Sequence, residues 1–440
     1  MAIARSLATG ASSMRAHQQR FDVIANNIAN SNTIGFKSGR AVFVEQFNQI
    51  QALGKSPDNR SGNGAGGVNP MQIGLGVRMG SVINNMSQGA LESTQRPLDL
   101  ALQGDGFFVY NLNGNELYSR AGAITRDRDG FLVDASSGAY LQGYNTEIDA
   151  DGKAVKDADG NNVLNRTVEN LKIDPSVISE PKQTQTLTVQ GNLNSQSPEG
   201  TERKTSITII DNQGGARTLN LTFTKTANAN EFSVAASIDG NDVALDATTL
   251  TFNADGTLDT PQTLNITATD LNAALGSQVF DETEPKDIAI NLVEPGNLGG
   301  SLTQFAGPNT VTISSQDGYK SGELAGLAVD YEGKIWGTFT NGQSEILGQV
   351  VMAKFSNDGG LQKESGNFFA VSPNSGSASI GTAGEIFPST RIMGNALEMS
   401  NTDMTVEFTD MISTQRAFEA SSRTIQTTDL MLSMINQLKR

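Results

Sequence analysis

Cysteine is absent from this chain of 440 residues, and histidine occurs once, at His17. Without cysteine there can be no disulfide framework, zinc-thiolate site, iron-sulfur cluster or thiol nucleophile, and one histidine cannot build a multi-histidine metal site. Most metal enzymes and triad enzymes are therefore excluded. No cofactor and no metal are expected, and the chain is not predicted to be an enzyme.

Long apolar runs and an excess of positive charge are missing as well. No apolar run approaches the roughly 18 residues that a bilayer-spanning helix needs, and charged residues such as Arg5, Arg15 and Arg20 interrupt the first thirty positions, unlike a signal peptide. The 31 basic residues are outnumbered by 47 acidic ones. The resulting net charge of −16 at pH 7 would repel nucleic acid and anionic membranes, so neither is expected as a partner.

Both ends of the chain carry the pattern of a helix with a narrow apolar stripe. Apolar residues recur at a spacing of seven, first at Leu7, Met14, Phe21 and Ile28, and later at Met404, Met411, Phe418, Ile425 and Leu432. This period predicts one helix over the first thirty residues and a second that ends at Leu438, with Ser400 and Asp403 as its capping box. Because a narrow stripe needs a partner, we expect the helices to pair as a coiled coil or to pack on neighbouring molecules. Packing on a globular core is the alternative, and His17 is interpreted as a packed side chain on this seam.

The middle of the chain has the pattern of an all-β structure. Short alternating segments lie at residues 187–190, 206–210, 219–223, 232–234 and 309–313, and turn dipeptides such as Asn113-Gly114 and Asp239-Gly240 recur. Residues 54–67 are rich in Gly, Ser and Asn, which predicts a flexible stretch.

The candidate chemical motifs are weak. Asp149, Asp151, Asp157 and Asp159 resemble a calcium loop in spacing, but the closing Glu is missing, so turn formation is the favoured interpretation. The abundant carboxylates leave a glycosidase pair open, although one Trp and six Tyr are few for a sugar-binding cleft.

Several segments, taken in order, resemble the bacterial flagellar rod, hook and hook-associated family. The N-terminal signature is ANNIANSNTIGFK at residues 25–37, with Asn26, Asn27, Asn30, Gly35 and Phe36 as its motif positions. It is followed by LDLALQGDGFFV at 98–109, YSRAG at 118–122, DGFLV at 129–133 and LQGY at 141–144. The C-terminal signature is similar to GNALEMSNTDM at 394–404 and MISTQRAF at 411–418. About 170 residues separate Tyr144 from Gly318, and this length favours the hook members over the shorter distal-rod members.

The resemblance implies mainly β domains in series, discontinuous and nested, with terminal helices that pair as a coiled coil. Residues 1–95 and 400–440 would form the inner helical layer with a connecting segment, residues 96–145 and 316–399 a middle β domain, and residues 146–315 an outer β domain.

The function that the resemblance implies is that of an extracellular structural subunit. It would polymerise into the curved, flexible tube that joins rod to filament and transmits motor torque. Its partners would be further copies of itself, the rod, hook-cap and hook-filament junction proteins, and the flagellar type III export apparatus. A distal-rod structural protein is the alternative, followed by a secreted β-rich adhesin and, last, a hydrolase.

Overall fold

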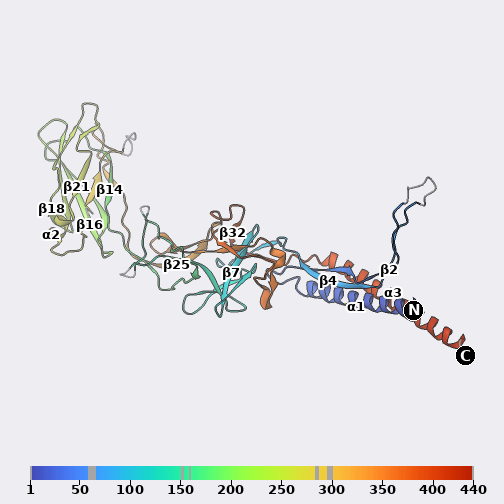
Figure 1. The fold of residues 1–440 in the computed structure, drawn as a ribbon. Helices are drawn as coiled ribbons and strands as arrows, with labels where there is room; N and C mark the ends of the chain where they lie inside the picture. Colours follow the sequence, from blue (N-terminus) through green and yellow to red (C-terminus); the bar gives the residue numbers. More distant parts are fainter. Residues whose placement is uncertain are drawn as a thin grey trace. The chain divides into compact units, whose positions relative to one another are not determined.

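The computed structural model describes residues 2–57, 66–149, 153–157, 160–282, 287–294 and 301–438. The chain divides into two compact units (Figure 1). Unit 1 contains Met1–Asp174, Leu327–Gly337 and Ile346–Arg440, and unit 2 contains Pro175–Gly326 and Thr338–Glu345. Residues 58–65, which make up most of the predicted flexible stretch, lie outside the described residues, as do Asp151 and Asp159 of the aspartate motif.

Unit 1 holds the two long terminal helices, as predicted. Helix α1 is Ala2–Ala29 and helix α3 is Met404–Leu438. The predicted capping box is wrong in detail: Asp403 alone caps α3, because its carboxylate accepts hydrogen bonds from the backbone N–H groups of Thr405 (2.8 Å) and Val406 (3.3 Å). None of the helices in the described ranges is long and apolar enough to cross a bilayer.

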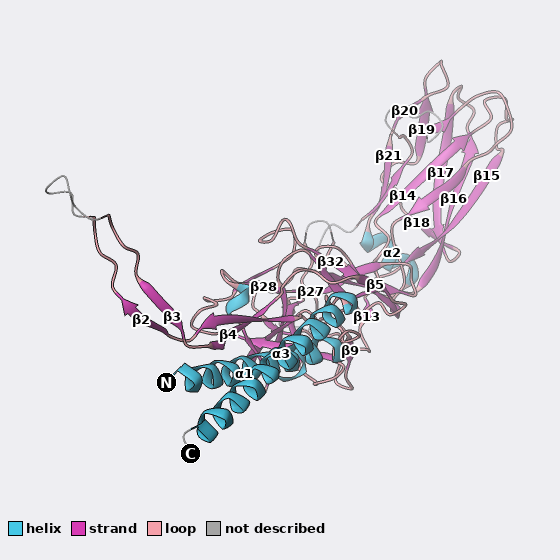
Figure 2. Ribbon diagram, turned by 90° about the vertical axis from the view of Figure 1, so that its right-hand side faces the viewer, coloured by secondary structure: helices cyan, strands magenta, loops and turns pink. Residues whose placement is uncertain are grey.

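Two antiparallel ribbons follow α1. Strands β1 (Gly39–Glu45) and β4 (Val77–Asn84) pair with each other and pack on α1, whereas β2 (Asn48–Ala52) and β3 (Met71–Gly74) form a second ribbon. Figure 2 shows β4 beside the helices and the β2–β3 ribbon projecting away from them. Every residue of β2 and β3 is exposed, so the second ribbon has no core of its own.

The rest of unit 1 is a β structure with an aromatic cluster in its core. Its main sheet runs in the order β27-β11-β7-β8-β30-β29, and Phe107, Tyr118, Phe355 and Phe369 pack edge to face in the core. The predicted Asn113-Gly114 turn joins β7 to β8 with both residues at positive φ. The strands are β5 (Leu91–Ser93), β6 (Leu100–Gln103), β7 (Phe107–Leu112), β8 (Asn115–Ser119), β9 (Ile124–Arg126), β10 (Leu132–Asp134), β11 (Tyr140–Asn145), β12 (Glu169–Asn170), β28 (Met352–Lys354), β29 (Gln362–Lys363), β30 (Phe368–Ala370), β31 (Ser379–Gly381), β32 (Arg391–Gly394) and β33 (Ala396–Glu398), with short 3₁₀ turns at Asp358–Gly360 and Ser365–Asn367. Strands β25 (Gly322–Val329), β26 (Lys334–Phe339) and β27 (Ser344–Val350) contain residues of both units.

Unit 2 is built from two sheets that share one apolar core. One sheet has the order β21-β22-β14-β23 with β24 beside β14, and the other the order β15-β16-β17-β19-β20 with β18 beside β17. Alternation along β16 places Leu219, Leu221 and Phe223 in the core, as the period of two predicts. The strands are β13 (Ile178–Ser179), β14 (Thr186–Asn192), β15 (Glu202–Ile210), β16 (Ala216–Lys225), β17 (Glu231–Ile238), β18 (Asn241–Val243), β19 (Thr249–Phe252), β20 (Leu258–Thr260), β21 (Thr263–Ile266), β22 (Ile288–Asn291), β23 (Leu302–Thr303) and β24 (Thr312–Gln316).

The expectation of an all-β middle is wrong at one place. A short helix, α2, spans Ala268–Leu275 in unit 2. The Thr267 side chain accepts a hydrogen bond from the backbone N–H of Asp270, and Gly276 closes the helix in the left-handed conformation. A capping Thr and a terminating Gly are ordinary helix signals, but eight residues are too few for a clear period to show in the sequence.

Candidate functional site

The candidate site is the face of unit 1 formed by α1 and α3, together with the junction where both helices meet the β structure. The helices run antiparallel and side by side (Figures 1 and 2). Three contacts define the register of one helix against the other: the hydrogen bond between Ser13 Oγ and Ser421 Oγ (2.9 Å), the Arg20–Asp410 ion pair (3.0 Å), and the hydrogen bond from Asn27 Nδ2 to Glu407 Oε1 (3.0 Å).

Small and hydroxyl-bearing residues line the contact between the two helices. A Cβ on Gly10 would lie 2.9 Å from Ile425 Cγ1, so this glycine allows a close approach. Thr414 and Thr428 are buried on α3, and their hydroxyls donate to the carbonyls of Asp410 and Thr424 in the preceding turn. The hydroxyls are thus satisfied within the helix, and the helices pack closely without large apolar side chains at these positions.

The predicted seam residues are divided between this contact and the surface. Phe21, Met404 and Phe418 are exposed, at 39%, 40% and 39%. The other six are half-buried: Leu7, Met14, Ile28, Met411, Ile425 and Leu432. Further apolar side chains of α3 are also exposed, including Val406, Phe408 and Ile412. The sequence therefore identified the apolar residues of these helices, but much of their apolar surface has no cover within the chain.

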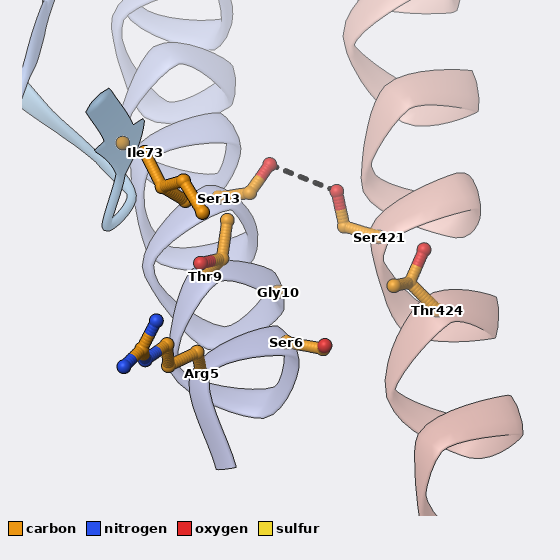
Figure 3. Close-up of a pocket in the computed structure, with 9 residues that line it drawn as sticks. Arg5, Ser6, Thr9, Gly10, Ser13, Ile73, Ser421 and Thr424 are labelled. Carbon is orange, nitrogen blue, oxygen red and sulfur yellow. Dashed lines mark hydrogen bonds between the residues drawn. The ribbon is translucent and has the colours of Figure 1, made fainter. Parts of the chain in front are cut away.

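Two hollows lie between the helices. The first, of about 510 Å³, is lined mainly by hydroxyl groups and glycine, with Arg5 and Ile73 at its border (Figure 3). In Figure 3 the Ser13 and Ser421 side chains point toward each other across it. The second, of about 350 Å³, is lined by His17, Gln18, Phe21, Thr414, Gln415 and Phe418. The second hollow is the more apolar of the two, because two exposed Phe rings border it.

His17 is the packed side chain that the sequence predicts. Its ring stands edge to face against Phe43 of β1, with 5.5 Å between the centroids. Burial, and secondarily the charge of Arg20, lowers the pKa of His17, so the neutral ring is favoured here.

The asparagines of the N-terminal motif fix the chain where α1 ends. Asn30 Nδ2 donates to the backbone carbonyl of Asn26 (2.9 Å) and to its side-chain oxygen (3.0 Å). Asn27 is buried, donates to the Gly39 carbonyl (2.8 Å) and accepts from the Gly39 N–H (2.9 Å). These bonds hold β1 against the end of α1, a role that the sequence resemblance did not specify.

Gly35 and Phe36 of the same motif occupy constrained positions. Gly35 has φ +66°, and a Cβ there would lie 2.5 Å from the backbone nitrogen of Ala121, so only glycine fits. Phe36 is buried, and Lys363 Nζ lies 3.9 Å from the centroid of its ring.

Sequence reasoning missed a buried charge cluster next to this motif. Glu398 accepts hydrogen bonds from Lys37 Nζ (2.6 Å), Arg120 Nη1 (3.3 Å) and the backbone N–H of Gly89 (2.8 Å). The three charged side chains are at most 3% exposed. Burial lowers the pKa of Lys37, although the attraction of Glu398 acts in the opposite direction.

The cluster joins four distant parts of the chain: the end of the N-terminal motif, residues 87–89, the β structure, and the segment before α3. All three charged residues lie within segments that resemble the family, Lys37 in 25–37, Arg120 in 118–122 and Glu398 in 394–404, and this was the only signal in the sequence. The arrangement has the properties of an electrostatic clamp rather than of a catalytic site.

The exposed β2–β3 ribbon is the other unusual surface. Phe47, Ile50, Leu53, Val68 and Met71 are all more than half exposed. An isolated two-stranded ribbon is at best marginally stable in water, so this one is expected to need a partner.

Comparison with known proteins gives consistent matches over the whole chain. Residues 7–37 match the flagella basal body rod protein family, residues 144–319 the flagellar basal body protein FlaE D2 domain, and residues 393–438 the flagellar basal body rod FlgEFG protein C-terminal family. The chain is 33% identical to the flagellar hook protein FlgE of Treponema pallidum, over 99% of this chain and 100% of that one. It is 34% identical to the FlgE of Borreliella burgdorferi, over 99% of both chains, and 33% identical to that of Escherichia coli, over 97% of this chain and 98% of that one.

Proposed function

This chain belongs to the family of flagellar hook proteins, as a structural subunit of the extracellular bacterial flagellar hook, and we propose that it assembles through the apolar surfaces of α1 and α3. The observation that carries the proposal is the exposure of the α3 stripe. Met404, Phe408, Ile412 and Phe418 are 40%, 47%, 53% and 39% exposed in the single chain. Apolar surface of this extent on one helix is typical of a surface that another molecule covers.

In the proposed assembly, α1 and α3 form the inner layer of a tube. The close contact at Gly10 and Ser13 pairs the helices within one subunit, and the outward stripes form coiled-coil contacts with neighbouring copies. The exposed β2–β3 ribbon would contact a neighbour too, which supplies the cover that it lacks. Residues 96–145 with 316–399 would form the middle layer and residues 146–315 the outer layer.

The proposed partners beyond further copies are the rod, the hook-cap and hook-filament junction proteins, and the type III export apparatus. A tube of this kind bends as a universal joint when its outer contacts are weak and wet, and the acidic composition of the chain suits such contacts. The role is structural rather than catalytic. A distal-rod protein is not favoured, since the full-length matches are to hook proteins.

The test replaces Phe418 by Asp. A charge buried in an apolar contact costs several kcal/mol, so tubes should not form while the β structure stays folded. Ser413→Asp is the matched control, because Ser413 is exposed five residues away, about 140° around the helix. Electron microscopy shows whether tubes form, and circular dichroism shows whether the β structure is folded. Tubes of normal length from the Phe418 variant would refute the assignment of this stripe.

A further inference from the structure

The last two turns of α3 carry an apolar ridge, made of Leu430, Met431, Met434 and Ile435. These four side chains are 60%, 58%, 62% and 48% exposed. Residues three and four apart on a helix are neighbours on its surface, and such spacings link all four residues into one patch, called here the C-terminal ridge. Thr428, on the adjoining turn, is buried. It lies seven residues after Ser421, and therefore on the face of α3 where Ser421 forms a hydrogen bond with Ser13 of α1. The ridge is therefore continuous with the face of α3 that already packs on another helix.

The ridge also holds reactive sulfur. The chain has 12 Met and no Cys, so thioethers are its only sulfur groups. Among the described residues, Met431 and Met434 are the two most exposed methionines, whereas Met352 in the core is 0% exposed. Exposure to solvent controls how readily a thioether is oxidised.

We propose that Met431 and Met434 form an oxidation site that controls the addition of subunits, an inference that rests on the proposed function. Hydrogen peroxide transfers one oxygen atom to the thioether sulfur. The sulfur lone pair forms the new S–O bond as the O–O bond breaks, and the proton of the transferred oxygen passes to the departing hydroxide, which leaves as water. Sulfur is oxidised by two electrons and the peroxide is reduced by two.

The sulfoxide changes what the ridge can pack against. It is polar and carries a strong hydrogen-bond acceptor, and burial of such a group without a donor is unfavourable. The occupant of the ridge is a second copy of this chain. Asp429 beside the ridge and Arg15 on α1 are both exposed, and neither has an ion pair among the described residues, so the two helices offer opposite charges to a neighbouring copy. Free subunits are open to oxidation, and assembled subunits are protected.

The experiment treats the free full-length chain with hydrogen peroxide, removes the peroxide with catalase, and maps oxygen addition by peptide mass spectrometry. The critical concentration for tube formation is then measured by sedimentation. Oxidation should raise it roughly tenfold, which corresponds to about 1.4 kcal/mol. A Met431→Leu, Met434→Leu double variant keeps the apolar volume and should lose much less of its assembly after peroxide than the wild-type chain. Methionine sulfoxide reductases should restore assembly of the oxidised chain.

A Met71→Leu variant is the matched control, because Met71 is 55% exposed on the β2–β3 ribbon, and this variant should remain sensitive. Equal loss of assembly in the double variant would overturn the proposal, as would normal assembly of chains oxidised at both positions. Equal oxidation of the ridge in tubes and in free subunits would show that no neighbour covers it. Failure of the untreated chain to form tubes would overturn the proposed function itself, which separates the two results.

Discussion

Replacing Glu398 by Gln is expected to destabilise unit 1 by about 3–5 kcal/mol, the usual loss when one member of a buried ion pair is removed. The neutral side chain would leave two buried cations, Lys37 and Arg120, which lie 2.6 and 3.3 Å from the present carboxylate. Lys37→Met should be milder, at roughly 1.5–3 kcal/mol, since Arg120 still balances Glu398 and the variant loses only the hydrogen bonds from Lys37 to Glu398 and to the Ser87 carbonyl. The asymmetry follows from charge: the first change leaves two cations and no anion, and the second leaves one of each.

The assay uses the only tryptophan. Trp336 lies in unit 1, where its indole N–H donates to Asp330 Oδ2 at 3.0 Å, so its fluorescence reports the unfolding of this unit during urea denaturation. The control is Arg166→Gln, which removes a surface pair with Glu385 (80% and 59% exposed) and should change the free energy of unfolding by less than about 1 kcal/mol. Equal losses of unfolding free energy in the Glu398 and Lys37 variants, or a Glu398 variant as stable as wild type, would refute the stabilising role of the buried charge cluster.

Three further predictions concern the helices and their junction. Burial lowers the pKa of His17, so the packing of α1 on β1 should be complete above pH 6.5 and should weaken as the pH falls from 6.5 toward the lowered pKa. Because the chain has one histidine, proton NMR of its imidazole ring measures this pKa directly. A pKa at or above 6.5 contradicts the prediction. Gly35→Ala should lower the free energy of unfolding by about 1–2 kcal/mol from the left-handed conformation alone, and by more because the added Cβ would meet the backbone of Ala121. Gly114→Ala, also at positive φ but with no atom within 4 Å of the added Cβ, should cost less. Equal losses in urea denaturation would contradict the close contact at Gly35. Gly10→Val should push α1 away from Ile425 and speed amide exchange in both helices, and unchanged protection would show that the helices pack elsewhere.

Much of the local structure could be predicted from the sequence, because local patterns act over a few residues. The period of seven marked both terminal helices, and they occupy Ala2–Ala29 and Met404–Leu438. Positive φ at Asn113 and Asp239 confirms two of the predicted turns. The strand expected at residues 309–313 instead spans Thr312–Gln316, since alternation alone fixes a strand's ends poorly.

The sequence by itself determined the helices, the strand pattern, the family and the apolar character of the seam, since period, turn residues and signature motifs can all be read along the chain. Tertiary structure alone decided which seam residues are covered: Phe21 and Phe418 stay exposed, whereas Thr414, a polar residue, is buried. It alone assembled Lys37, Arg120 and Glu398 into one cluster. The physical reason is distance along the chain: these charges are separated by tens to hundreds of residues, and only the folded packing determines which of them share a site from which water is excluded.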